Sequence, residues 1–245
     1  MGPRMLSTDR PDRAILLPAM NDLVFLFDVD NTLLDNDQIQ RDLNAHLGTT
    51  YGETARDRYW ALFEELRKDV GYADYLGALQ RYRLEELHNP RVLRIANFLA
   101  DYPFADRLYP ASLAAVRRAK AWGTAVIMSD GDAAFQPRKV ERSGLWREFG
   151  DDVLIFVHKE ESLDFVERLY PARHYVMVDD KLWILAALKQ AWGTRVTTVF
   201  PRQGHYALEP GVEARYPRPD ITLSSIGDLL NYERAAFAGE KPRGE

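Results

Sequence analysis

The fold is decided by the stretch Leu23-Val-Phe-Leu-Phe-Asp28-Val-Asp30-Asn-Thr32-Leu-Leu34. Its first five residues are apolar, which predicts a strand covered on both faces, as in a parallel sheet. The strand runs directly into two carboxylates, Asp28 and Asp30, which in extended chain lie roughly 6.6 Å apart on one face. Two negative charges at that spacing need a cation, a shared proton or good solvation. The alternative is that one aspartate starts a turn and the other caps it.

Composition places the chain among ordinary globular proteins. It has 245 residues, a formal net charge of −5 and no cysteine. The acidic balance argues against nucleic acid as a partner, and the missing thiols exclude disulfides and cysteine metal sites. No apolar run is long enough to span a membrane, and the N-terminal residues lack the apolar core of a signal peptide. We therefore expect a cytoplasmic protein without a membrane partner; its oligomeric state stays open.

The order of sequence patterns predicts an α/β fold with a Rossmann-like, three-layer parallel sheet and a small all-helical cap. Residues 37–105 show apolar residues only at helical spacing, which indicates about four helices. From residue 110 onward helices and apolar strands alternate, as in right-handed crossovers of a parallel sheet. The expected core is 1–36 and 106–245, with a loose lead at 1–20 and a frayed tail at 233–245.

Individual elements are predicted from glycine and proline positions and from apolar runs. The expected helices are 110–122, 137–143, 160–170 and 182–192, and the expected strands are 23–27, 124–128, 153–157, 175–178 and 195–200. In an open parallel sheet, ligands bind beyond the carboxyl ends of the strands. The residues that follow each expected strand are therefore the candidates for a site.

Polar groups follow four of these strands. They are Asp28, Asp30 and Thr32 after the first, Ser129, Asp130 and Gly131 after the second, Lys159 after the third, and Asp179 and Asp180 after the fourth. Each one alone has an ordinary explanation as a helix cap or a solvated surface residue. Together they bring carboxylates, a hydroxyl and an ammonium to one edge of the sheet.

This order of groups resembles the haloacid dehalogenase superfamily of phosphohydrolases. Asp28-Val-Asp30-Asn-Thr32 is similar to its first motif, and Ser129, Lys159 and the pair Asp179-Asp180 are similar to its second, third and fourth motifs. The expected helical segment falls where that family places a helical cap. The resemblance implies a nucleophile at Asp28 and an acid two residues later, which the phosphatases have and the dehalogenating members lack.

The chemistry of the residues agrees with these roles. A carboxylate such as Asp28 can attack phosphorus, while Asp30 can protonate the leaving group and later activate water. Mg²⁺ prefers oxygen ligands, which Asp28, the Asp30 carbonyl and Asp180 would supply, with Asp179 in support. The expected phosphate contacts are Thr32, Ser129, Asp130, Gly131 and Lys159, where Lys159 also acts in catalysis.

Some positions depart from the family pattern. Asp130 stands where the family often has Asn, which puts a negative charge near the phosphate unless the side chain points away. Glu160 follows Lys159 where Pro is frequent, so Lys139 is the alternative lysine. Lys181 is expected to be a surface residue. His205 is read as an ordinary loop histidine that could reach the rim of the crevice.

The function predicted from these observations is Mg²⁺-dependent hydrolysis of a small phosphorylated metabolite through an aspartyl phosphate. The cap would select the leaving group, with hinges near Asp35 and Ala105. Three alternatives stay open: a phosphotransferase or phosphomutase of the same fold, a phospho-accepting receiver module, and a catalytically silent binding protein.

Overall fold

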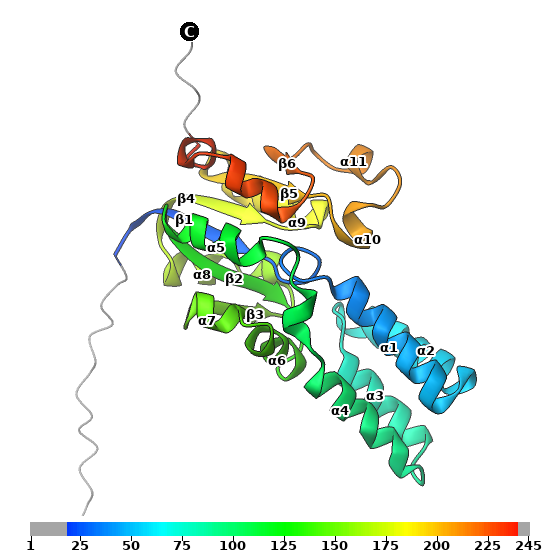
Figure 1. Cartoon of the computed structure of the whole chain (residues 1–245). Coiled ribbons are helices and arrows are strands. Elements are labelled where there is room, and N and C mark those ends of the chain that lie inside the picture. Colours follow the sequence, from blue (N-terminus) through cyan, green and yellow to red (C-terminus); the bar gives the residue numbers. More distant parts are fainter. Residues whose placement is uncertain (1–18, 240–245) are drawn as a thin grey trace, which may run out of the picture.

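A computed structural model of the chain describes residues 19–239, and its centre is a six-stranded sheet in which all paired strands are parallel (Figure 1). The strand order is β3-β2-β1-β4-β5-β6, so the first strand lies in the middle and the order reverses beside it. The strands are β1 (Asn21–Phe27), β2 (Thr124–Asp130), β3 (Val153–Phe156), β4 (Ala172–Val178), β5 (Val196–Pro201) and β6 (Ile221–Leu223). The predicted α/β class with a Rossmann-like sheet is confirmed.

Strand β1 is buried on both faces because its alternate side chains pack into two separate clusters. Phe25 and Phe27 face one cluster, and Val24 and Leu26 face the other. These side chains are fully buried, and burial of each one stabilises the fold by about 1.5–3 kcal/mol. The continuous apolar run of β1 thus reflects a strand between two layers of helices.

Helices cover both faces of the sheet. The Phe25 face carries α5 (Ser112–Lys120), α7 (Leu145–Phe149) and the 3₁₀ helices η5 (Ile226–Asn231) and η6 (Arg234–Phe237). The Val24 face carries α8 (Leu163–Leu169) and α9 (Leu182–Trp192). The connections also contain α6 (Phe135–Arg142), η2 (Phe104–Arg107), η3 (Lys159–Glu161), η4 (Gly193–Arg195), α10 (Gly204–Ala207) and α11 (Val212–Arg215).

A group of helices, residues 36–101, extends from the carboxyl edge of the sheet, and we call it the helical insert (Figure 1). It consists of α1 (Asn36–Tyr51), α2 (Glu53–Val70), α3 (Tyr75–Glu85), η1 (Pro90–Val92) and α4 (Leu93–Asp101). The α1 and α3 helices begin where the side chains of Asp35 and Asp74 accept hydrogen bonds from the backbone N–H groups of Gln38 and Gly77. The sequence predicted about four helices over this segment, and the structure has four α-helices there.

Most predicted elements are present, with helix and strand ends that differ by a few residues. The sequence missed β6, α7, α10 and α11, which are only three to five residues long. The frayed tail expected from residue 233 is wrong for η6, because Phe237 is fully buried against Phe25 and Trp122. The loose lead expected at 1–20 falls mostly outside the described residues.

Among residues 19–239, no helix combines the length and the apolar character that crossing a membrane requires.

Candidate active site at the carboxyl edge of the sheet

The parallel register brings the predicted site residues together at one edge of the sheet. Asp28 follows β1 directly, Ser129 lies near the end of β2, and Lys159 begins η3 after β3. Asp179 and Asp180 follow β4, which pairs with β1 on the side opposite β2. The strand order thus places these five side chains in one cluster, as the sequence predicted.

Lys159 is the cation of this cluster. Its Nζ lies 2.6 Å from Asp28 Oδ1 and 2.6 Å from Asp179 Oδ2, and the side chain is fully buried. Burial alone would lower the pKa of Lys159, but the charges of Asp179 and Asp28 outweigh it and raise the pKa. Lys159 is therefore the lysine that contacts the predicted nucleophile Asp28, whereas Lys139 contacts Asp30.

Asp28, Asp179 and Asp180 form a buried triad of carboxylates. One oxygen of each lies within 4.8 Å of the others. Burial raises the pKa of Asp179 to about 6 and that of Asp180 well above its ordinary value. Burial also acts to raise the pKa of Asp28, but Lys159 and Lys181 lower it on balance.

Three oxygens of this triad have neither a hydrogen-bond donor nor an ion-pair partner. They are Oδ2 of Asp28 and both carboxylate oxygens of Asp180, all buried, whereas the buried Asp179 Oδ2 has the Lys159 ammonium at 2.6 Å. Buried charged oxygens without partners are costly, and a hard divalent cation would satisfy them. The donor set therefore fits Mg²⁺.

Asp30, two residues after Asp28, is held by a second buried lysine. Lys139 Nζ donates to both carboxylate oxygens of Asp30, at 2.7 and 2.8 Å, and to Asn36 Oδ1 at 3.1 Å. Lys139 belongs to α6 and Asn36 begins α1 of the helical insert. The predicted acid of the site is thus tied both to the core and to the insert.

Ser129 contacts the predicted nucleophile. Its hydroxyl donates to Asp28 Oδ1 at 3.3 Å and accepts a hydrogen bond from Gln136 Nε2 at 3.0 Å. The sequence reasoning missed Gln136. The signal for it was its position on the buried face of α6, three residues before Lys139.

Two expected phosphate contacts have other roles in the structure. The Thr32 hydroxyl is fully buried and accepts a hydrogen bond from the Asp180 backbone N–H at 3.1 Å, which joins the first motif to the acidic pair. The Gly131 backbone N–H donates to the Phe156 carbonyl at 2.9 Å, so this donor is already engaged. The structure therefore does not support phosphate binding by Thr32 or by the Gly131 backbone N–H.

Asp130, the departure from the family pattern, is partly turned into the protein. Its Oδ1 accepts a hydrogen bond from the Lys159 backbone N–H at 2.8 Å, which fixes the start of η3. Burial and the nearby charge of Asp28 raise the pKa of Asp130, although Lys159 opposes this. Asp130 thus supports the loop that carries Lys159, while its side chain still lines the cavity described next.

A cavity of about 150 Å³ lies between the sheet edge and the helical insert. Core residues on its wall include Asp30, Asp130, Lys181, Trp183 and Tyr206, and insert residues include Asn36, Phe63, Arg67 and Tyr72. The expectation of a surface position for Lys181 is wrong, because the loop after β4 turns its side chain toward this cavity. Charged groups of the core and side chains of the insert therefore meet around one small space.

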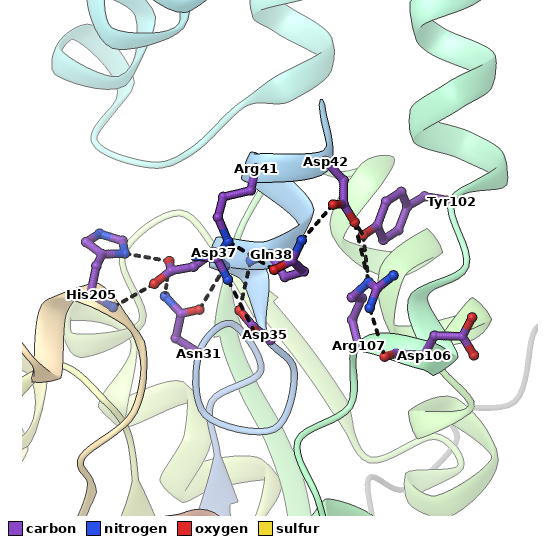
Figure 2. Close-up of polar contacts among 10 residues, drawn as sticks. All are labelled: Asn31, Asp35, Asp37, Gln38, Arg41, Asp42, Tyr102, Asp106, Arg107 and His205. Atoms are coloured by element: carbon purple, nitrogen blue, oxygen red, sulfur yellow. Dashed lines mark hydrogen bonds and ion pairs between the residues drawn. The ribbon is translucent and has the colours of Figure 1, made fainter. Parts of the chain in front are cut away.

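Two clusters of polar side chains connect the core with the helical insert (Figure 2). In the first, the Asn31 side chain contacts Asp37, and His205 donates its backbone N–H to Asp37 Oδ2 at 2.7 Å while its ring Nδ1 lies 2.6 Å from Oδ1. In the second, Tyr102 donates to Asp42, and Arg107 Nε donates to the Tyr102 oxygen at 2.8 Å. His205 is thus a contact between the core and α1 that also lines the cavity, rather than an ordinary loop histidine.

Comparison with known proteins agrees with this arrangement. Residues 23–191 match the family model described as haloacid dehalogenase-like hydrolase. A crystal structure described as a haloacid dehalogenase-like hydrolase of Burkholderia xenovorans LB400 is 58% identical, covers 88% of this chain and 98% of its own, and superposes with a TM-score of 0.84. No curated protein matches the sequence significantly.

More distant structures share the fold. The HAD-hydrolase YfnB of Bacillus subtilis, solved with magnesium, is 16% identical over 86% of this chain and 97% of its own, with a TM-score of 0.58. L-2-haloacid dehalogenase of Xanthobacter autotrophicus is 18% identical over 85% of this chain and 96% of its own, with a TM-score of 0.56. The matched motifs, the sheet order and the 58% identical neighbour agree, and the chain belongs to the haloacid dehalogenase-like hydrolases.

Proposed function

We propose that the chain is a phosphohydrolase that cleaves small phosphate monoesters. The observation that carries the proposal is the position of Asp30. It follows Asp28 by two residues on the same loop, and its carboxylate lines the cavity beside the buried nucleophile. A carbon–halogen bond needs no proton donor to release halide, whereas an alkoxide leaving group does.

The proposed reaction has two displacements. A carboxylate oxygen of Asp28 attacks phosphorus while the bond from phosphorus to the leaving oxygen breaks, and Asp30 gives that oxygen its proton. A water molecule then attacks the aspartyl phosphate while Asp30 takes a proton from it. The phosphorus–Asp28 bond breaks, inorganic phosphate leaves, and both carboxyl groups return to their starting states.

The other residues of the cluster would position and neutralise these groups. Lys159 holds Asp28 in place and offers positive charge where the phosphoryl oxygens gather. The Ser129 hydroxyl, fixed by Gln136, would contact the same oxygens. Mg²⁺ held by Asp28 and Asp180, with support from Asp179, would supply electrostatic stabilisation of the phosphoryl charge.

The test measures phosphate released from 4-nitrophenyl phosphate and from short alkyl phosphates, with MgCl₂ or with EDTA. We expect Mg²⁺-dependent turnover that Asp28→Asn abolishes. Asp22→Asn is the matched control, because Asp22 lies on the same strand at its opposite end and is 70% exposed. Halide release from 2-chloropropionate without any phosphate release would mean that the chain is a dehalogenase and that the proposal is wrong.

A further inference from the structure

Two cations lie near one aromatic ring in the lining of the cavity. The Arg67 guanidinium carbon lies 5.7 Å from the centre of the Tyr206 ring, and Lys181 Nζ lies 5.6 Å from the same centre. Arg67 also donates to the Tyr206 hydroxyl. The three residues come from α2, from the loop after β4 and from α10, so only the folded arrangement of insert and core brings them together.

Neither cation forms an ion pair with a carboxylate that lines the cavity, although the charges of Asp28, Asp179 and Asp180 beneath it partly offset that of Lys181. Arg67 has one carboxylate nearby, Glu64 at 3.5 Å, an exposed neighbour on the same helix of the kind that contributes little. Within residues 19–239, no carboxylate lies within 4 Å of Lys181 Nζ, whereas Lys139 and Lys159 each contact one closer than 2.8 Å. Two like charges near one ring repel each other, and an anion between them would relieve that repulsion.

Of the three acidic residues that line the cavity, Asp30 is paired with Lys139, and the other two lie toward the other half of the sheet. Asp130 ends β2 and Glu160 belongs to η3 after β3, on one side of β1. Lys181 and Tyr206 follow β4 and β5 on the opposite side. Among the residues that the structure describes, neither Asp130 nor Glu160 lies within ion-pair distance of Arg67 or Lys181.

We propose that the leaving group of the substrate carries a second anionic group, a carboxylate or a second phosphate, which binds between Arg67 and Lys181 beside Tyr206. This inference rests on the proposed phosphohydrolase function, which places the leaving oxygen at Asp30. The cavity of about 150 Å³ matches the space that benzene fills in a protein interior. The substrate class is therefore a small phosphate ester whose leaving group carries a second anionic group, and chains of two to four carbons are the first to test.

Arg67→Gln tests the proposed anion subsite with substrates that differ only at the end of the leaving group. Carboxyalkyl phosphates of two to four carbons are compared with hydroxyalkyl phosphates of the same length. Loss of a charge-assisted contact should lower kcat/KM by about 10-fold to 100-fold for the carboxyalkyl series, mainly through KM, and by less than about 3-fold for the hydroxyalkyl series. Alkanediol bisphosphates in parallel show whether a carboxylate or a phosphate is preferred.

Arg58→Gln is the matched control. Arg58 lies on the same helix, but its Nε donates to Glu85 at 2.8 Å on the exposed surface, away from the cavity. We expect this variant to treat both substrate series as the wild type does. Equal kinetics of Arg67→Gln and Arg58→Gln, with active wild type, would refute the anion subsite and leave the phosphohydrolase function standing.

Binding without turnover separates the two proposals. Calorimetry with carboxyalkyl phosphonates, which are not hydrolysed, should give tighter binding than with hydroxyalkyl phosphonates, and Arg67→Gln should remove this preference. If the wild type hydrolyses no phosphate ester but keeps the preference, the function is wrong and the anion subsite is retained. If the preference is absent in the wild type, the subsite proposal is wrong.

Discussion

The buried cluster at the sheet edge and the insert side of the cavity hold their charged groups in different ways. In the buried cluster, Asp28, Lys159, Asp179 and Asp180 are at most 1% exposed and are fixed by contacts within hydrogen-bonding distance or by close packing. On the insert side of the cavity, Arg67 has a side chain that is 37% exposed and contacts the core through Tyr206. Groups that react must be held rigidly, whereas groups that recognise a leaving group must admit it and let it go.

Among the substitutions considered, Lys159→Met should have the largest effect, and it acts on the buried cluster. This change leaves Asp28 and Asp179 as neighbouring buried carboxylates without their common cation, which should cost about 3–5 kcal/mol of unfolding free energy. Phosphate release should fall by roughly 10²-fold to 10³-fold. Urea unfolding and steady-state kinetics measure both effects, with the exposed Lys68→Met of α2 as control. A variant with unchanged kinetics would remove Lys159 from the proposed mechanism.

Lys139→Met tests whether the second buried lysine serves Asp30. Without its two contacts to Lys139, the Asp30 carboxylate would no longer be held at the leaving oxygen. We expect kcat to fall roughly 10-fold to 100-fold for alkyl phosphates, whose leaving group needs a proton, and less than about 3-fold for 4-nitrophenyl phosphate. Equal losses on both substrates would indicate a general structural role, and recovery by Lys139→Arg would support positioning.

Asp180→Asn tests the metal assignment through stability alone. Burial raises the pKa of Asp180 in the folded state. In metal-free protein, the contribution of Asp180 to the free energy of unfolding is therefore complete below the ordinary aspartate pKa and is lost as the pH rises through the folded-state pKa. The variant should therefore melt higher than the wild type at pH 7 without metal, with a difference that shrinks toward pH 4. Added Mg²⁺ should raise the Tm of the wild type and much less that of the variant.

The exposed Asp151→Asn is the control for this measurement, and it should leave both the metal-free Tm and the Mg²⁺ effect unchanged. The same Mg²⁺ effect on Asp180→Asn as on the wild type would place the ion elsewhere.

The smallest effect on stability is expected for Asp37→Asn, at the contact between the core and the helical insert. Burial acts to raise the pKa of Asp37, but contacts from His205 and Asn31 lower it on balance. The stabilising contribution of Asp37 is therefore present above the ordinary aspartate pKa and is lost as the pH falls through the lower folded-state pKa. Because this ion pair is partly exposed, Asp37→Asn should cost at most about 1 kcal/mol, or about 2–4 °C in Tm at pH 7. A double-mutant cycle with His205→Ala measures the coupling free energy between Asp37 and His205. A coupling of zero would mean that the contact shown in Figure 2 does not stabilise the protein.

Much of the buried cluster at the sheet edge could be predicted from the sequence, since its groups lie at the ends of apolar strands. The rule that parallel strands present their carboxyl ends on one side was enough to predict the grouping of Asp28, Ser129, Lys159 and Asp179. The pairing of Lys139 with Asp30 could not be predicted, because it joins a helix to a loop 109 residues away. The same holds for Arg67 and Tyr206, which are 139 residues apart. Such contacts depend on how the insert packs, and no local pattern encodes that packing.

Errors elsewhere have similar causes. Strand β6 is three residues long and too short to show a period. The residues around η6 look like a polar tail, yet Phe237 fills a gap beside Phe25 that only the packed sheet creates. Lys181 follows an acidic pair as a solvated lysine would, and only the loop direction after β4 turns it inward.

The central place of β1 has a consequence for synthesis of the chain. Its neighbours β2 and β4 begin at Thr124 and Ala172, so the ribosome delivers the first strand long before either partner exists. At about 5–20 residues per second, the run from Leu23 to Phe27 waits on the order of 10 seconds or more before it can be enclosed. During that time the most apolar part of the sequence is exposed to the translating cell, and the helices of residues 36–101, which form from local contacts, are the first structure that can fold beside it.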